Sequence, residues 1–276
     1  MRKIIAIILL YFTGCFLIPC LVTLAIGNRK ERVVATDKVD APVIEEDQII
    51  RAVATYYKEG DNKEFLKALA IVIRTCYSVD SDVAPKTSTY EELKEKWGTY
   101  YSANYEAVIN AVKETKGMII SSDTDEVLPY FCEVSAGYTR GRDKTCLGMV
   151  SCSNDLTAPD YLSVVTYSAN EVADKLKISG ENILESFQVI SRDEAGYVDM
   201  VMVGNLTISG DELSNTLGLN SSNFMVTTAD NSITFTVKGV GNGYGMSLYS
   251  ARIKAAEGAG YKEILLYYYK NISINE

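Results

Sequence analysis

The chain has 276 residues, which is long enough for one large domain or two small ones with an ample core. It is 47% hydrophobic and 23% charged, a globular balance that excludes wholesale disorder, a collagen-like chain and a coiled coil. A net charge of −9 without a basic block argues against nucleic acid as a partner. The sequence contains no His, which excludes His-based catalytic triads and His metal ligands.

An uncharged apolar run occupies residues 4–27, directly after Arg2 and Lys3. Its length is about that needed to cross a bilayer as a helix, and the positive charges before it place the N-terminus in the cytoplasm. We therefore predict a cytoplasmic tip and transmembrane anchor at 1–27, a linker at 28–47 and an extracytoplasmic domain at 48–276. This protein would be a single-pass protein of the cell membrane. Lipidation at Cys15 is the alternative, and the apolar residues that continue beyond Cys15 argue against it.

The predicted extracytoplasmic domain begins with helical periodicity and then changes to strand-like alternation. The segment 64–77 is apolar nearly all round, so we expect it to be a buried helix covered by the apolar C-terminal segment 264–268. The other expected helices are 47–57, 90–97, 103–115, 168–176, 209–217, 246–257 and 262–269. The expected strands are 118–120, 127–131, 161–165, 198–203 and 232–237. Helices at both ends of a strand-rich middle predict an α+β fold in one mixed domain.

Four cysteines lie beyond the apolar run. Cys76 falls in the predicted buried helix and is expected to be a packed thiol. Cys132, Cys146 and Cys152 are close together in sequence, and an extracytoplasmic compartment permits a disulfide. Three thiolates are also a partial ligand set for zinc. We favour a disulfide or free thiols over the zinc hypothesis, and we predict neither a metal nor another cofactor.

A Gly-rich stretch, residues 239–247, directly precedes the expected helix 246–257. Glycines at such a place let the backbone approach a ligand and expose the amides of the helix N-terminus. A tight strand-to-helix turn is the simpler interpretation. The chain also has 19 Tyr against 7 Phe, a balance suited to an apolar but hydrogen-bonding groove such as one that binds sugar.

Several blocks of the sequence follow one another in a recognisable order. GYGMSLYSA at 243–251 is followed by YKEILLYYY at 261–269, and EFLKALAIVIRT at 64–75 and YFCEVSAGYT at 130–139 come earlier. The segment 209–224 lies between them. Together these blocks resemble the stage II sporulation protein D/LytB amidase-enhancer family, whose blocks typically read GHGVGMSQYGA, YEEILKYYY, EALKAQAVAART, FHSTSGGxT and xGxEfRxxLGLrSxxF. The resemblance covers about residues 50–272.

The resemblance implies a membrane-anchored protein associated with peptidoglycan. Members of the family are similar to lytic transglycosylases or enhance a partner amidase. The implied partners are glycan strands, a cell-wall amidase or other hydrolase, and the cytoplasmic membrane. It also implies that the matching blocks converge with position 56 on one cleft. The ligand-binding residues implied there are Arg74, Ser135, Gly137, Thr139, Asn242, Gly243, Gly245 and Ser247.

The sequence departs from the family pattern at the catalytic acid. Counting back eight residues from the block at 64–75 gives Tyr56 where the family has a glutamate, and Cys132 and Asn242 replace two family His residues. Protonation of a glycosidic oxygen normally requires a carboxylic acid, and Tyr, with a pKa of about 10, is a far weaker acid. We therefore predict glycan binding, or assistance to a hydrolase, without glycan cleavage. The alternative is a lytic transglycosylase with a relocated acid, Glu59 or Glu133.

Overall fold

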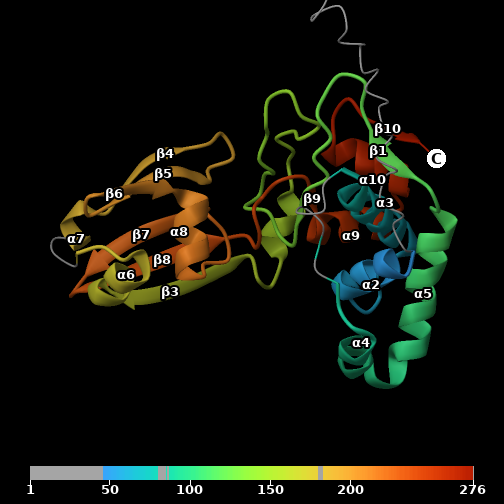
Figure 1. Ribbon diagram of the computed structural model, residues 1–276, viewed down its shortest axis with the longest axis horizontal. Coiled ribbons are helices and arrows are strands. Elements are labelled where there is room, and N and C mark those ends of the chain that lie inside the picture. The colour runs from blue at the N-terminus through green and yellow to red at the C-terminus, as the bar shows by residue number, and fades with distance from the viewer. Residues whose placement is uncertain (1–45, 80–84, 86, 180–182, 276) are drawn as a thin grey trace, which may run out of the picture. The chain divides into compact units, whose positions relative to one another are not determined.

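The computed structural model describes residues 46–79, 85, 87–179 and 183–275 (Figure 1). They belong to one compact unit, Ile44–Glu276. The predicted anchor and most of the predicted linker lie outside the described residues. Within the described ranges, no helix combines the length and the apolar character needed to span a membrane. The mixture of helices and strands confirms the α+β class.

The first hydrophobic core is built around α3 (Lys63–Val79). All side chains from Phe65 to Tyr77 are buried except Lys67, because other helices cover α3 on several sides. Among them is α10, whose Ile264, Leu265 and Tyr268 belong to the same core, as the apolar C-terminal segment predicts. The helices packed against α3 are α2 (Glu46–Tyr56), α5 (Tyr101–Glu114), α9 (Leu248–Ala256) and α10 (Tyr261–Tyr268) (Figure 1). The helix α4 (Tyr90–Trp97) contacts α2 and α5.

The second hydrophobic core lies between two antiparallel sheets and short helices. One sheet has the order β3–β8–β7, from Leu162–Ser168, Ser232–Lys238 and Phe224–Ala229. The other has the order β4–β5–β6, from Gln188–Arg192, Val198–Val203 and Leu206–Ser209. The helices are α6 (Ala169–Leu176), α7 (Ile183–Ser186) and α8 (Gly210–Leu217).

Local sequence explains how these elements begin and end. Asp230 and Asn231 both have positive φ, which a two-residue turn between twisted strands requires, and they join β7 to β8. Ser168 starts α6 by accepting the amide of Glu171, and Ser209 starts α8 in the same way. Along β8 the buried side chains alternate with half-buried ones, as expected for a strand that covers a core on one face.

Two small sheets bring together segments that are far apart in sequence. The strand β1 (Ile119–Ser121) pairs antiparallel with β10 (Ser273–Asn275). The strand β2 (Phe131–Cys132) pairs in parallel with β9 (Met246–Ser247), so the two family-like blocks lie next to each other. Two 3-10 helices, η2 (Gly98–Tyr100) and η3 (Ser153–Thr157), complete the described elements.

Some boundaries differ from those expected. The expected strand 127–131 is reduced to β2, since Pro129 has no amide hydrogen for a ladder. The expected helix 246–257 begins only at Leu248, because the two residues before it pair with β2. The strands β4, β6 and β7 were not predicted. Each is short or carries polar residues on the solvent face, which weakens the sequence pattern.

Candidate functional site

Tyr56, the last residue of α2, is half-buried. Its ring meets the edge of Phe131 with the ring centroids 5.0 Å apart and the planes at 89°. Burial raises the pKa of Tyr56 to about 12, and the negative charge of Glu133 contributes in the same direction. The hydroxyl therefore stays protonated through the physiological range. It can donate or accept a hydrogen bond, but it is a poorer acid than a free tyrosine.

Two cations from distant elements hold the backbone around Tyr56. The Arg252 guanidinium donates to the carbonyl of Tyr56 at 2.6 Å and pairs with Asp61 at 2.8 Å. The Lys96 ammonium donates to the carbonyls of Thr55 and Tyr57 at 2.8 and 3.1 Å. The last carbonyls of a helix have no partner within the helix, and cations stabilise that end. Position 56 is therefore fixed by α4 and α9 together.

The two candidate carboxylates have different surroundings. Glu133 follows β2, its side chain is one-third exposed, and it lies 3.7 Å from the ammonium of Lys58. Glu133 also contributes to the raised pKa of Tyr56. Glu59 is exposed and acts on the pKa of Tyr57 instead. Of these two carboxylates, Glu133 thus acts on the pKa of Tyr56, whereas Glu59 acts on that of its neighbour Tyr57.

Asp155 joins the family-like blocks from inside the protein. It is fully buried and accepts hydrogen bonds from the Ser135 amide at 2.7 Å, the Ser247 hydroxyl at 2.8 Å and the Ser250 hydroxyl at 2.6 Å. The sequence gives no sign of Asp155, because an isolated Asp in a 3-10 helix as short as η3 has no periodic pattern around it. Its partners show that Ser135 and Ser247 are occupied within the protein. They form part of the framework of the site.

Other predicted ligand-binding residues also have internal roles. Arg74 is buried. It donates to the carbonyl of Val112 in the last turn of α5 and to the carbonyls of Thr115 and Met118 just after this helix. The Thr139 hydroxyl is buried, donating to the Gly148 carbonyl and accepting the Val150 amide. Gly137 has a φ of 105° and its carbonyl accepts the Cys152 amide. Arg74 thus ties α3 to the end of α5, whereas Thr139 and Gly137 shape the loop after β2.

The Gly-rich stretch packs tightly against the rest of the protein. Gly243 and Gly245 both have positive φ. A Cβ at Gly243 would overlap the ring of Tyr197, and a Cβ at Gly245 would overlap the carbonyl of Tyr130. These glycines therefore serve close packing of the backbone. Asn242 alone of the predicted ligand-binding residues has an exposed side chain.

Arg140, which sequence reasoning also missed, ties this stretch to the second core. It is buried, pairs with Asp193 at 2.6 Å and Asp211 at 2.9 Å, and donates to the carbonyl of Asn242 at 3.3 Å. The rings of two tyrosines lie 4.5 and 5.0 Å from its guanidinium carbon, at distances typical of cation–π contacts. Arg140 thereby joins residues from three separate segments.

All four cysteines within the described residues are free and buried. Burial, followed by the charge of Asp155, raises the pKa of Cys132 well above its ordinary value and that of Cys152 to about 12. Burial also raises the pKa of Cys76 and Cys146. These groups are therefore protonated thiols. No cluster of three or more Cys, Asp or Glu side chains in the described part is arranged to hold a metal ion.

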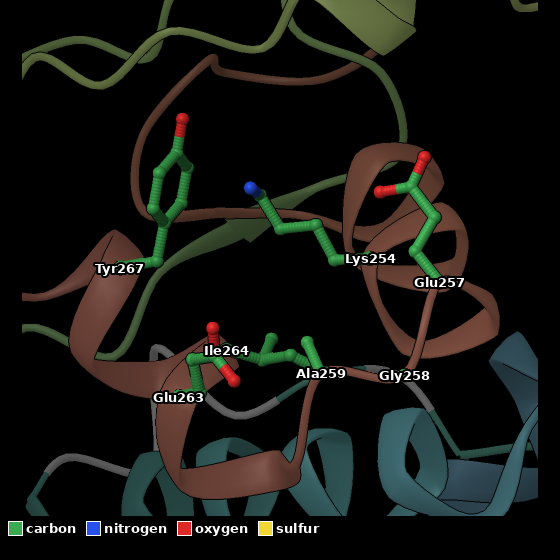
Figure 2. Close-up of a pocket in the computed structure, with 7 residues that line it drawn as sticks. All are labelled: Lys254, Glu257, Gly258, Ala259, Glu263, Ile264 and Tyr267. Atoms are coloured by element: carbon green, nitrogen blue, oxygen red, sulfur yellow. The ribbon is translucent and has the colours of Figure 1, made fainter.

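A cavity of about 370 Å³ lies between α9 and α10, away from the predicted residues (Figure 2). Figure 2 shows Lys254 extended from α9 toward the ring of Tyr267 on α10, and the ammonium is 3.6 Å from the ring centroid. The Tyr267 hydroxyl donates to the carbonyl of Ser151. The Lys254 ammonium, the cation that lines this cavity, thus already has an interaction partner within the protein. Nothing in the sequence pattern pointed to this cavity.

The structure is thus an α+β domain in which β2 pairs in parallel with β9, just before the start of α9. No protein-family model matches the chain. It is 28% identical over 241 residues to stage II sporulation protein D of Bacillus subtilis (strain 168), covering 81% of this chain and 70% of that protein. It is 28% identical over 257 residues to stage II sporulation protein D of Bacillus amyloliquefaciens, covering 84% and 74%. These two similarities, each over more than 80% of the chain, support a relationship to the stage II sporulation protein D family.

Proposed function

We propose that this protein acts at the cell wall during sporulation, where it binds glycan strands or assists a wall hydrolase without cleaving glycan itself. The names of its relatives support the link to sporulation. The observation that carries the non-catalytic part is Tyr56, which occupies the position where the family resemblance implies a catalytic glutamate.

The surroundings of Tyr56 argue against Tyr56 acting as the general acid in place of a glutamate. A general acid works best when its pKa lies near the working pH. The pKa of Tyr56 is raised to about 12, away from that range. A half-buried tyrosine ring beside Phe131 instead provides an apolar face with a polar end. Such a surface suits the C–H face and the hydroxyls of a sugar.

Co-sedimentation with insoluble peptidoglycan tests the binding. The full-length protein, purified in a mild detergent, is expected to pellet with the wall material while the sugar chains stay intact. A Lys63→Ala variant is a suitable control, since this exposed lysine lies at the start of α3. If the wild-type protein remains in the supernatant at all protein concentrations, the binding role is wrong.

The alternative function is lytic transglycosylation with a relocated acid. The observation that favours it is Glu133, which is partly exposed and close enough to influence Tyr56. In that case Glu133→Gln should abolish the release of anhydro-muropeptides, whereas Glu59→Gln should leave it unchanged. The opposite outcome would favour Glu59, and no release by the wild-type protein would remove the alternative.

The proposed site of action is the extracytoplasmic face of the cell membrane. Residues 4–27 carry this part of the proposal because they form a long uncharged run after two basic residues. Fractionation of cells should find the full-length protein with the membrane. Recovery of the full-length chain in the soluble cytoplasmic fraction would refute the anchor.

A further inference from the structure

A polar cavity of about 270 Å³ lies between the start of α8 and the Gly-rich stretch. Three exposed asparagines line it: Asn215 from α8, Asn220 from the loop after α8, and Asn242 from the Gly-rich stretch. The Gly241 amide donates to the Asn220 carbonyl at 2.8 Å, which fixes two of these segments to each other. Its walls therefore come from two of the family-like blocks.

The hydrogen-bonding groups left free in this cavity complement one another. The Asn242 Oδ1 accepts the amide of Tyr244 at 2.9 Å, so its Nδ2 remains as a donor. The Asn220 Nδ2 donates to the Ser163 hydroxyl at 3.3 Å, so its Oδ1 remains as an acceptor. In the part of the chain that the structure describes, the Asn215 side chain has no hydrogen-bond partner, so it offers both a donor and an acceptor.

The cavity is close to neutral. Among the described residues that line it, Asp211 alone is charged, and Arg140 pairs with both of its oxygens at 2.9 and 3.0 Å. Leu219 adds an apolar contact. By contrast, the cavity in Figure 2 and a third cavity of about 700 Å³ beside Arg142 and Lys270 are lined by several charged side chains. A neutral ligand with both donors and acceptors fits the asparagine cavity best.

We infer that this cavity is a subsite for one neutral sugar residue of a glycan strand. This inference rests on the proposed function and adds a second place, besides Tyr56, at which the protein would contact the glycan strand. Each sugar hydroxyl or acetamido group needs both a donor and an acceptor, which the three amides supply. Pockets for drug-sized ligands measure about 300–1,000 Å³, so a cavity near the lower limit accommodates a single ring and not a longer segment.

Two substitutions test the subsite. Asn215→Ala removes an amide with no described partner, and Ala is the better helix former, so the fold should be retained. Asn242→Asp keeps an oxygen that accepts the Tyr244 amide, replaces the free donor by a second acceptor and adds a negative charge to the cavity. Asn170→Ala is the matched control, because Asn170 is exposed on α6 and does not line this cavity. Thermal denaturation of all three variants should match that of the wild-type protein.

The readout is the dissociation constant of the full-length protein for glycan strands freed of their peptides by an amidase. Loss of one neutral hydrogen bond should raise Kd about three- to tenfold in Asn215→Ala. Asn242→Asp, which also adds a charge, should raise Kd at least as much, and Asn170→Ala should leave it unchanged. Unchanged Kd in both test variants overturns the subsite while the proposed function stands. If the two variants instead lose affinity for isolated stem peptides, the cavity takes a peptide and the sugar assignment is wrong. If the wild-type protein binds no glycan at all, the proposed function fails as well.

Discussion

Removal of the Asp155 carboxylate should destabilise the protein more than almost any other polar substitution. Asp155→Ala leaves three buried donors without an acceptor: the Ser135 amide and the hydroxyls of Ser247 and Ser250. An unsatisfied buried donor costs about 1–3 kcal/mol, and the two hydroxyls can rotate toward other acceptors, so we expect a loss of about 3–5 kcal/mol. Domains are stable by only about 5–15 kcal/mol, so this is a large share.

Asp155→Asn tests the two carboxylate oxygens separately, because it replaces one of them by an NH2 group. If the amide keeps its oxygen toward the two serine hydroxyls, its NH2 group faces the Ser135 amide, and one bond becomes a donor–donor contact. The expected loss is about 1–3 kcal/mol. Asp160→Ala, an exposed position five residues away, is the matched control and should change stability by less than about 0.5 kcal/mol.

Urea denaturation followed by tryptophan fluorescence or circular dichroism measures these differences. For a domain of 150–250 residues, about 1 kcal/mol moves Tm by about 2–4 °C, so Asp155→Ala should lower Tm by roughly 6–20 °C. The expected order of stability is Asp160→Ala, then Asp155→Asn, then Asp155→Ala. If Asp155→Ala is as stable as the control, the buried carboxylate does not hold the blocks together and the account of the framework is refuted.

Three further predictions concern the same region. Gly245→Ala should cost about 2 kcal/mol or more, because its Cβ overlaps a carbonyl. Gly218→Ala, with open space at a similar positive φ, should cost only about 1 kcal/mol, and equal losses in denaturation would contradict this. Arg140→Ala removes a buried cation from two partly exposed carboxylates and should lose about 1.5–3 kcal/mol, the worth of hydrogen bonds to charged groups. Exposed Arg142→Ala should lose almost nothing in the same assay. Because its pKa is raised in the folded state, Tyr56 contributes stability that is present below pH 10 and lost as pH rises toward 12. The stability of Tyr56→Phe should therefore change with pH as that of the wild-type protein does from pH 5 to 9, and fall by about 1–2 kcal/mol less between pH 10 and 12. A parallel dependence of stability on pH in the two proteins up to pH 12 would contradict the raised pKa.

The helices of the first core could be predicted because their pattern is strong. The segment around α3 is apolar nearly all round, and only a helix covered by others can bury such a surface. The apolar segment 264–268 was the expected cover, and the structure places it there. The strands β4 and β6 are short, and their alternation is too brief to stand out from a loop.

The candidate site was predictable in outline and not in detail. The family-like blocks that the sequence sets in order do meet, through the pairing of β2 with β9. A block pattern does not tell whether a hydroxyl points into the protein or out of it, so Thr139 and Ser247 were expected to bind ligand although both are buried. Asp155 and Arg140 are determined by contacts between distant segments, which no local pattern reveals.

The most direct test of the central claim is mass spectrometry of peptidoglycan incubated with the full-length wild-type protein and with Tyr56→Glu. We expect no anhydro-muropeptides above the buffer control for the wild-type protein, because the hydroxyl at position 56 is too weak an acid to protonate a glycosidic oxygen. Release of these products by Tyr56→Glu alone would show that the surroundings still accept a glycan strand. Release by the wild-type protein, abolished in Glu133→Gln, would contradict the account and establish a relocated acid.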